Sequence, residues 1–310
     1  MALGHDPQSP AQAGRSKESI VAFVETASLE VTMPSEADIE LLAKHLKAGT
    51  EVFLSDVPRR SAGKLVESCA RLAAGGLAPV PHVAVRKMTS ANSFERLLAE
   101  CVEVGGVRKT MLIAGDQPEP SGPFADVAEA LRGGDLRRCG VDAVAVAAYP
   151  DGHPHISAEA LDHALTTKLA LLEERGLEKQ IVSQFGFDSQ AVSGWLARLR
   201  QTGKRDPVCI GMAGPASTAA LMRFAMRCGV RTAARGLVRD ANRVGGLFTH
   251  QPERLIAPLA AIAGGPENAP VKAHFFSFGG IEKTARWIRA LQRGQFSIVN
   301  GAIRLDSSLS

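Results

Sequence analysis

The sequence predicts a single-domain (β/α)8 barrel (TIM barrel), and three observations lead to this expectation. Short apolar or β-branched runs alternate eight times with longer amphipathic patterns. Some short runs, such as Ala143–Tyr149, are apolar almost throughout, which is typical of parallel strands covered on both faces. The longer patterns begin at Ser or Asp and end at Gly, as helices do. Eight strand–helix units favour a closed barrel.

A doubly wound open sheet is the alternative fold. Such sheets usually have fewer strands and carry a glycine-rich turn after the first strand. Here the first predicted strand is followed by Met33-Pro34-Ser35, so the G-x-G-x-x-G fingerprint of dinucleotide-binding sheets is missing.

The elements follow one another in a regular order. The predicted strands are Ser28–Met33, Glu51–Asp56, Val80–Val85, Thr110–Ala114, Ala143–Tyr149, Ile181–Phe187, Val208–Met212 and Ala273–Phe278. The predicted helices between them run from Ser35 to Gly49, Ser61 to Gly75, Ser93 to Gly105, Ser157 to Gly176 and Asp188 to Gly203. The first of them opens with a capping-box-like Ser35-Glu-Ala-Asp38.

Two segments do not fit the repeat. The first 17 residues lack an apolar signal-peptide core and predict a disordered tail, so that residues 18–310 form the barrel domain. The segment from Arg231 to Gly265 is too long for one crossover helix, and we expect an extra helical excursion there, before the last strand.

Composition excludes several classes of protein. No apolar run among the 310 residues approaches the ~20 needed to span a bilayer. The five cysteines form no C-x-x-C pair, which disfavours a disulfide framework or structural zinc site and favours the cytoplasm. A diffuse net charge of +4, with 12 Phe, 2 Trp and one Tyr, does not indicate a nucleic-acid groove.

Common catalytic motifs are also missing. The Gly-His-Pro-His run at 152–155 has no further ligand at metal-binding spacing, so we expect no metal site. The chain contains neither a G-x-S-x-G elbow nor a Walker loop, which disfavours a serine hydrolase and a P-loop NTPase.

Polar residues collect at the ends of the predicted strands, where barrel enzymes carry their active sites. This set comprises Glu30, Ser55, Asp56, His82, Asp116, Tyr149, His153, Gln184, Asp188 and the Gly211–Pro215 turn. Several members have a structural alternative: Glu30 as half of a buried ion pair, His82 as a core histidine bonded to a carbonyl, and Gly115-Asp116 as a plain turn. Gln184 is more indicative of function, because an amide is costly to bury without partners.

Taken in order, these segments resemble the methylenetetrahydrofolate reductase family, whose members are flavin-containing (β/α)8 barrels. The resemblance extends from about residue 25 to about residue 290. The most specific matches are Ala147-Ala-Tyr-Pro-Asp-Gly-His-Pro154 and Ser183-Gln-Phe-Gly-Phe-Asp188. Weaker matches are Ser28-Leu-Glu30 with Pro34, Pro81-His82, Gly115-Asp116-Gln-Pro118 and His274-Phe-Phe276.

The resemblance implies a role for two carboxylates. Glu30 is similar in position to the general acid, which protonates N10 of 5,10-methylenetetrahydrofolate and opens the imidazolidine ring; a raised pKa is expected of such a group. Asp116 is similar to the carboxylate near the pterin and the flavin, where negative charge stabilises the iminium cation.

The resemblance also implies the binding residues. Those that would contact FAD are Ser55, His82, Gly115, Asp116, Tyr149, His153, Asp162 and Lys168, the last at a phosphate. Those that would bind the folate are Gln184, Phe224 and Phe278.

Four positions depart from the family's pattern. Ala114 stands where an arginine contacts the flavin, and Leu165 replaces a polar residue on the same helix face as Asp162. Ala220 stands where a folate-binding amide is expected, and Gly280 where an arginine is expected. Arg59, Arg60, Arg86 and Lys87 are cations near the mouth that could compensate.

Three functions therefore remain open. The chain is a flavin-dependent reductase that takes hydride from NADH or NADPH, or the nicotinamide donates hydride directly to the folate. Alternatively, it is a folate-binding methyltransferase subunit, although a methyl carrier needs no acid for ring opening. We expect a cytoplasmic oxidoreductase that binds folate and a nicotinamide nucleotide and neither nucleic acid nor membrane. Whether FAD is bound and whether the chain forms a homo-oligomer stay open.

Overall fold

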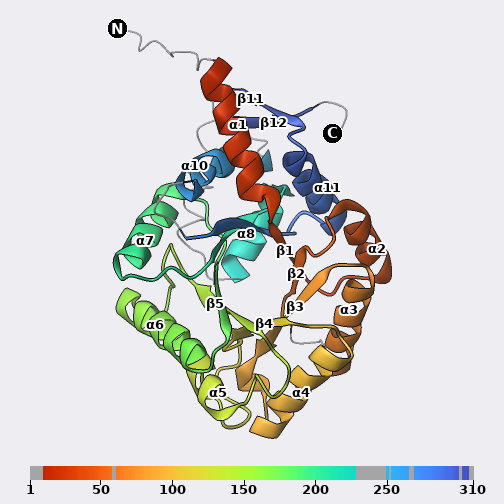
Figure 1. Cartoon of the computed structure of the whole chain (residues 1–310), viewed down its shortest axis with the longest axis vertical. Helices are drawn as coiled ribbons and strands as arrows, with labels where there is room; N and C mark the ends of the chain where they lie inside the picture. Colours follow the sequence, from red (N-terminus) through yellow and green to blue (C-terminus); the bar gives the residue numbers. More distant parts are fainter. Residues whose placement is uncertain are drawn as a thin grey trace.

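A computed structural model describes residues 10–57, 61–227, 249–250, 253–264, 269–299 and 302–306. Within these residues, eight parallel strands form a closed barrel in the order β1-β10-β7-β6-β5-β4-β3-β2, which confirms the predicted (β/α)8 fold (Figure 1). The strands are β1 (Ser28–Val31), β2 (Glu51–Leu54), β3 (Ala78–Ala84), β4 (Lys109–Ile113), β5 (Ala143–Ala148), β6 (Glu178–Ser183), β7 (Val208–Ala213) and β10 (Val271–Phe276).

Helices surround the barrel and pack their apolar stripes on the outer face of the strands (Figure 1). They are α2 (Glu36–His45), α3 (Ala62–Ala74), α4 (Ala91–Glu103), α5 (Val127–Gly133), α6 (Ala158–Glu174), α7 (Ser189–Gln201), α10 (Glu253–Ala263) and α11 (Ile281–Gln292), with a short 3-10 turn, η1 (Val85–Lys87), after β3.

The predicted helix starts are confirmed at four positions, where a Ser or Asp side chain accepts a hydrogen bond from the first turn: Ser35, Ser61, Ser157 and Asp188. The predicted start of α4 at Ser93 is wrong. The cap is Ser90, because its hydroxyl accepts from the Ser93 backbone N–H while the Ser93 hydroxyl accepts from the Ser90 N–H.

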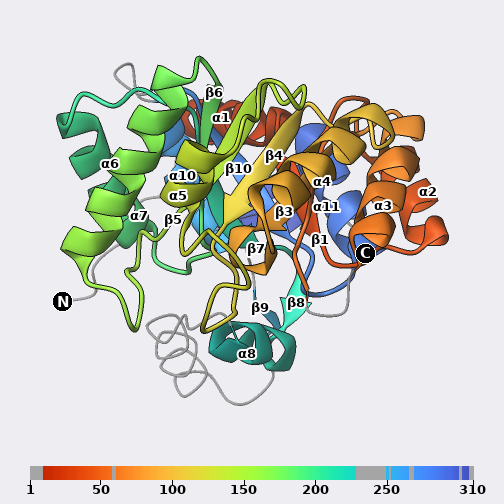
Figure 2. The ribbon, with the colours of Figure 1, turned by 90° about the horizontal axis from the view of Figure 1, so that it is seen from below.

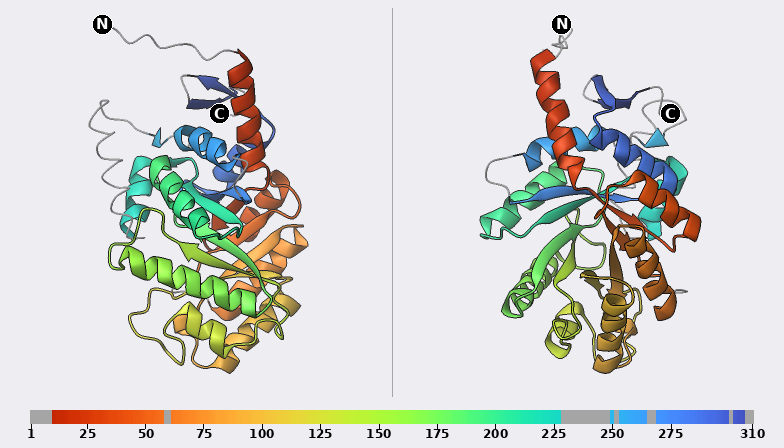
Figure 3. Two further views of the ribbon diagram at one scale, coloured as in Figure 1. Left: turned by 60° about the vertical axis from the view of Figure 1, so that its left-hand side comes forward. Right: turned by 45° about the vertical axis from the view of Figure 1, so that its right-hand side comes forward.

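The expected disordered tail is wrong for residues 10–17, because helix α1 (Pro10–Glu25) begins well before Lys17; residues 1–9 lie outside the described part. Ile20, Phe23 and Val24 are buried, and α1 packs against α10 and α11. Lys17 Nζ donates to the Phe296 carbonyl at 2.9 Å. Phe296 begins β11 (Phe296–Val299), which pairs antiparallel with β12 (Ala302–Leu305) beside α1 (Figure 3). The buried apolar side chains and this hydrogen bond hold α1 against the barrel, although its own sequence gives no clear signal for a helix.

Two described helices lie between β7 and the last barrel strand, β10. Helix α8 (Thr218–Arg227) follows β7 and a short strand, and α10 packs against α1 and α7 as an outer helix of the barrel. The short strands β8 (Ala216–Ser217) and β9 (Thr249–His250) pair antiparallel beside α8, and all three lie at one end of the barrel (Figure 2). Most of the predicted excursion, residues 231–248, 251–252 and 265, lies outside the described residues.

The barrel interior has an apolar layer in its middle and a charged cluster at its lower end, the end at which the parallel strands begin. Phe53, Val80, Met111, Ala145, Val182 and Cys209 fill the middle. Below them Glu51 accepts hydrogen bonds from Lys109 Nζ at 2.5 Å and Lys272 Nζ at 2.9 Å. Burial raises the pKa of the Glu51 carboxyl, but the two lysines outweigh it and lower that pKa to about 2. Glu51 is therefore the counter-ion that lets two lysines lie inside the barrel.

No helix in the described part of the chain is long and apolar enough to cross a membrane.

Glu51→Gln should lower the free energy of unfolding by about 3 kcal/mol at neutral pH, because it leaves Lys109 and Lys272 without their counter-ion. The folded-state pKa of Glu51 lies below its ordinary 4.5, so its stabilisation is complete above that pH and is lost as the pH falls towards 2. Urea unfolding at several pH values measures the difference between wild type and variant, which should shrink on acidification.

The matched control is Glu173→Gln, which removes an ion-pair partner of Lys179 that is 75% exposed. Its cost should stay below ~1 kcal/mol. An equal loss in both variants would show that the cluster inside the barrel has no special weight.

Candidate functional site

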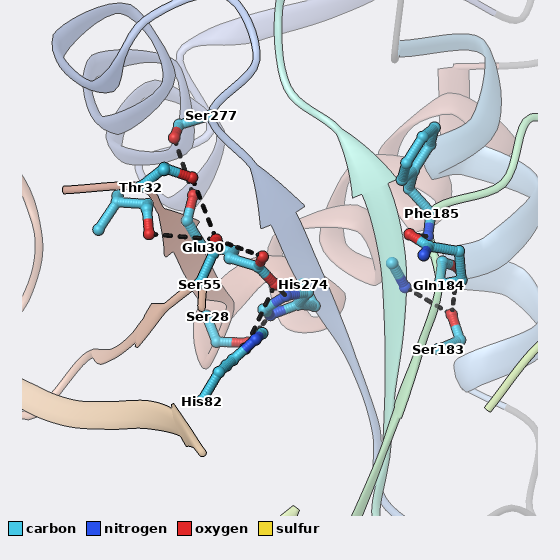
Figure 4. Close-up of polar contacts among 12 residues, drawn as sticks. Ser28, Glu30, Thr32, Ser55, His82, Ser183, Gln184, Phe185, His274 and Ser277 are labelled. Atoms are coloured by element: carbon cyan, nitrogen blue, oxygen red, sulfur yellow. Dashed lines mark hydrogen bonds and ion pairs between the residues drawn. The ribbon is translucent and has the colours of Figure 1, made fainter. Parts of the chain in front are cut away.

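Glu30 lies in β1 and points into the end of the barrel at which the parallel strands finish. Its side chain is 13% exposed. The Ser55 hydroxyl, just after β2, donates to Glu30 Oε1 at 2.6 Å, and the Thr32 hydroxyl donates to Ser55 Oγ at 3.2 Å (Figure 4). Glu30 and Thr32, the latter just after β1, lie on the same side because residues two apart along an extended chain face the same way.

Two histidines face the second oxygen of this carboxylate. His274 Nε2, from β10, lies 3.4 Å from Glu30 Oε2, and His82 Nε2, from β3, lies 3.6 Å from the same atom. His274 is fully buried and its other ring nitrogen, Nδ1, is 2.8 Å from Ser28 Oγ. The Phe53 ring packs edge-on against both imidazoles, with centroids 4.8 Å from His274 and 6.0 Å from His82.

The pKa of the Glu30 carboxyl is shifted in the direction opposite to the one expected. Burial does raise the pKa of this carboxyl, but His82, His274 and the Ser55 hydroxyl together outweigh burial and lower it below the ordinary value. The expectation of a raised pKa is therefore wrong for this arrangement. At neutral pH Glu30 is therefore a carboxylate.

An aromatic wall stands next to this carboxylate. The rings of Phe224 (on α8) and Phe278 stack at 4.1 Å with an interplanar angle of 15°, and Phe276 lies 5.3 Å from Phe278. These rings, with Glu30, Thr32, Ser55, Ser277, Gly280 and Ile281, line a cavity of about 130 Å³. Ser277 fixes one edge, because both its N–H and its hydroxyl donate to the Glu30 carbonyl. A carboxylate and flat apolar rings thus face one space.

Gln184 stands at the end of β6, with the ribbons of β10 and β7 between it and Glu30 (Figure 4). Its Oε1 accepts from the Phe185 N–H at 3.0 Å, and its carbonyl accepts from the Ser183 hydroxyl at 3.0 Å. Ser183 Oγ also accepts from the Gly211 N–H at 2.8 Å. Phe185 lies 4.9 Å from Phe278, so the turn that carries Gln184 is continuous with the aromatic wall.

The segment after β5 brings two expected residues together. Tyr149 is half-buried at the strand end and makes an edge contact with His153 at 5.4 Å, so the single tyrosine lies at the barrel mouth and not in the core. Between them, Asp151 Oδ1 is buried and has no hydrogen-bond partner among the described residues. Burial, with the nearby Asp188, raises the pKa of the Asp151 carboxyl to about 6.

The remaining positions assigned to FAD follow β4 or lie on α6. Asp116 and Asp162 are exposed, and Gly115 has a φ of +93° and a backbone against Ala84 that leaves no room for a Cβ. Lys168 is half-buried and its Nζ lies 3.4 Å from the Ala147 carbonyl. Ser55 and His82, also assigned to FAD, are both engaged with Glu30.

The cations expected at the mouth are engaged as well. Arg86 donates to the carbonyls of Gln117 and Ala125, and Lys87 pairs with Asp56 at 2.5 Å. Arg59 and Arg60 lie outside the described residues. Arg86 and Lys87 thus already serve carbonyls or a carboxylate of the chain itself, whereas Lys168 has the 3.4 Å contact with the Ala147 carbonyl.

Three of the four departures from the family's pattern have local reasons, and nothing in the structure explains the alanine at 114. Leu165 and Ala220 are buried, so both serve packing. Gly280 has a φ of +115° and precedes α11, a conformation that disfavours any side chain, arginine included.

Sequence reasoning assigned no role to Ser28, Thr32, Ser277 or His274. Ser28, Glu30 and Thr32 alternate along one face, which was a signal that all three belong to the site. The partnership of His274 with Glu30 had no such signal, because 244 residues separate them.

The fold and site together define a (β/α)8 barrel with a buried carboxylate–histidine network at its mouth. No family model matches the chain. One similar solved structure is a protein from Clostridium thermocellum described as binding two copies of 5-methyl-5,6,7,8-tetrahydrofolic acid; it shares 15% identity at a TM-score of 0.54, over 89% of this chain and 96% of that one. At that identity the likeness shows the barrel fold alone.

Two further solved structures score lower. A proposed deoxyribose-phosphate aldolase from Toxoplasma gondii has 10% identity and a TM-score of 0.46, over 90% of this chain and 97% of that one. A proposed lyase or mutase from Burkholderia cenocepacia has 14% identity and a TM-score of 0.47, over 89% and 86%.

Lys168→Met should stabilise the protein by about 1 kcal/mol at neutral pH. Burial lowers the pKa of the Lys168 ammonium from 10.5 to about 8, so holding the charged form in the folded protein costs free energy. That cost is present below about pH 8 and is relieved as the pH rises towards 10.5, so the gain should shrink over this interval. Thermal unfolding of both proteins at several pH values measures it.

Lys179→Met is the control, because Lys179 pairs with Glu173 and Asp206 and should give no gain. A destabilised Lys168→Met protein would show instead that the ammonium has a stronger partner than the Ala147 carbonyl.

Proposed function

We propose that this protein interconverts 5,10-methylenetetrahydrofolate and 5-methyltetrahydrofolate, with NADH or NADPH as the hydride donor. The observation that carries the proposal is Glu30, a buried carboxylate with two histidines behind it and a cavity with aromatic walls in front. The resemblance of the strand-end segments to methylenetetrahydrofolate reductases supports it. So does the barrel from Clostridium thermocellum, whose ligand is the product of this reaction.

The binding surface suits flat, partly polar rings. Phe224 and Phe278 offer faces on which a pterin or nicotinamide ring can stack. The Gln184 amide, at the end of β6, is the hydrogen-bonding group that we assign to the pterin edge, and exposed Asp116 the negative charge near the iminium.

The chemistry needs one proton and one hydride. Glu30, which is a carboxylate at rest, first takes up a proton from solvent and passes it to N10. The bond between N10 and the bridging methylene breaks, and N5 becomes an iminium, N5=CH2+. Hydride from C4 of the nicotinamide then adds to that carbon and leaves a 5-methyl group and an oxidised nicotinamide. The Glu30 carboxylate that remains is stabilised by Ser55 and the two histidines, which lowers the barrier to proton release.

In the related reductases FAD carries the hydride between nicotinamide and folate. We propose direct transfer for this protein, because Lys168, Arg86 and Lys87 are engaged within the chain and His82 lies behind Glu30. We therefore derive no step through a flavin.

The visible spectrum of the purified protein, followed by NADH and NADPH oxidation with methylenetetrahydrofolate, tests the proposal. A colourless protein that oxidises either nucleotide only when the folate is present supports direct transfer. A yellow protein that bleaches with NADH and recovers with the folate would overturn direct transfer but keep the reductase. Binding of 5-methyltetrahydrofolate without any redox activity would overturn the reductase in favour of a methyl-carrying subunit.

Glu30→Gln should reduce the rate of folate reduction by about 10²–10⁴-fold, because the amide cannot supply a proton to N10. The dissociation constant for 5-methyltetrahydrofolate should change little, because the amide is nearly the same size as the acid. Stopped-flow nicotinamide oxidation and titration calorimetry measure the two quantities. Glu67→Gln, on exposed α3 surface, is the matched control; wild-type turnover in Glu30→Gln would remove Glu30 from the mechanism.

A further inference from the structure

The lower end of the barrel carries a polar layer at a level where barrels of this fold usually have branched apolar side chains. The layer consists of Glu51 (β2), Lys109 (β4), Gln180 (β6) and Lys272 (β10), one residue from every second strand of the barrel. The other three side chains all donate to the Glu51 carboxylate. The layer lies at the end opposite to Glu30, and the proposed reaction uses none of its groups.

This layer has an excess of positive charge. Two ammonium groups, on Lys109 and Lys272, face one carboxylate. Glu51 is charged at neutral pH, because burial raises the pKa of its carboxyl but the two lysines lower it to about 2. Among the described residues, neither lysine lies within 4 Å of a second carboxylate. A partly buried ammonium without its own counter-charge is unfavourable, so the layer favours one further negative charge.

Both lysines also have N–H groups that the chain does not use. An ammonium has three donors, and within the described part of the chain Glu51 is the only hydrogen-bond acceptor of either lysine. The side chains of Lys109 and Lys272 are each 21% exposed, so solvent reaches them at the lower end. A small anion can therefore approach both ammonium groups without passing through the mouth of the barrel.

Gln180 adds a second requirement, because its amide oxygen needs a donor. The residue is 3% exposed, and its Nε2 donates to Glu51 Oε2 at 3.3 Å. Its Oε1 is buried and has no hydrogen-bond partner among the described residues. Reversing the amide would set its oxygen against the carboxylate, so the orientation is fixed. A group that completes this layer thus has to bring a hydrogen-bond donor as well as a negative charge.

Small side chains next to the layer leave room for such a group. Ala78 pairs with Glu51, and Ala143 pairs with Lys109, in the register of the barrel. Each alanine lies two residues before a residue of the apolar middle layer, Val80 or Ala145, and therefore also faces the interior. No large side chain fills the layer at these two positions, which suits an ion of a few atoms.

We propose that the lower end of the barrel binds a small, singly charged oxyanion that carries a hydroxyl group, of which bicarbonate is the smallest common example. Its charged oxygens accept from Lys109 and Lys272, and its hydroxyl donates to Gln180 Oε1. Binding is non-covalent; it neutralises the excess charge and stabilises the folded barrel. The site is remote from Glu30, so the inference goes beyond the proposed function and does not rest on it.

Urea unfolding of the full chain, in sealed cells at fixed pH and ionic strength, tests the ligand class. The unfolding midpoint should rise with the logarithm of the bicarbonate concentration once this exceeds the dissociation constant. Formate has the same charge but no hydroxyl, so we expect it to bind about tenfold more weakly, and chloride likewise. A midpoint that bicarbonate does not move would overturn the site. Equal effects of bicarbonate and formate would overturn the requirement for a hydroxyl.

Two charge variants should move the affinity in opposite directions. Lys272→Met removes the excess charge and should weaken bicarbonate binding by at least about tenfold, whereas Glu51→Gln increases the excess and should tighten binding and recover part of its lost stability. Lys179→Met is the matched control, because Lys179 lies next to Gln180 on β6 but pairs with Glu173 and Asp206. An equal loss of binding in Lys179→Met, or no response of Glu51→Gln to bicarbonate, contradicts the proposed site.

Gln180→Leu is the milder variant, in case Lys272→Met does not fold. It replaces the buried amide by an apolar side chain of similar size and keeps both lysines and Glu51. The preference for bicarbonate over formate should disappear, because the acceptor for the hydroxyl is gone. If Gln180→Leu still prefers bicarbonate tenfold, Gln180 does not read the hydroxyl and the proposed ligand class is wrong.

Discussion

Closure of the barrel between its first and last strands is the constraint on which the site depends. β1 pairs with β10 in parallel, with Ser28 opposite His274 and Glu30 opposite Phe276. This register sets the His274 ring between the Ser28 hydroxyl and the Glu30 carboxylate, and the next strand, β2, adds Ser55 from the other side. A slip of one residue would turn these side chains out of the barrel, so the chemistry is tied to the hydrogen-bonding register.

The charges inside the barrel follow one principle at two levels. At the lower end one glutamate offsets two lysines, and at the mouth one glutamate faces two histidines. In both places burial alone would favour the neutral acid, and in both the neighbouring bases outweigh it. The lysine cluster is permanently charged and serves stability, whereas histidines can exchange a proton near neutral pH. One glutamate facing two basic side chains thus stabilises the barrel at one end and forms a group that can bind a proton at the other.

Much of the framework could be predicted because its signals are local. The caps at Ser35, Ser61, Ser157 and Asp188 depend on a few neighbouring residues, and the continuous apolar run of β5 indicates a buried parallel strand by itself. Ser90 was missed as the cap of α4, because Ser90 and Ser93 offer the same local signal. Helix α1 was missed because its stability comes from packing on α10 and α11.

By itself, the sequence determined the barrel, the strand ends that carry polar side chains, and Glu30 and Tyr149 as residues of the mouth. Only the tertiary structure decided which groups surround Glu30 and hence its charge state. The physical reason is distance along the chain: strand alternation and capping act over a few residues, whereas the pKa of a buried carboxylate depends on every charge within a few ångströms. Two of the groups around Glu30, His82 and His274, reach it only when the barrel closes.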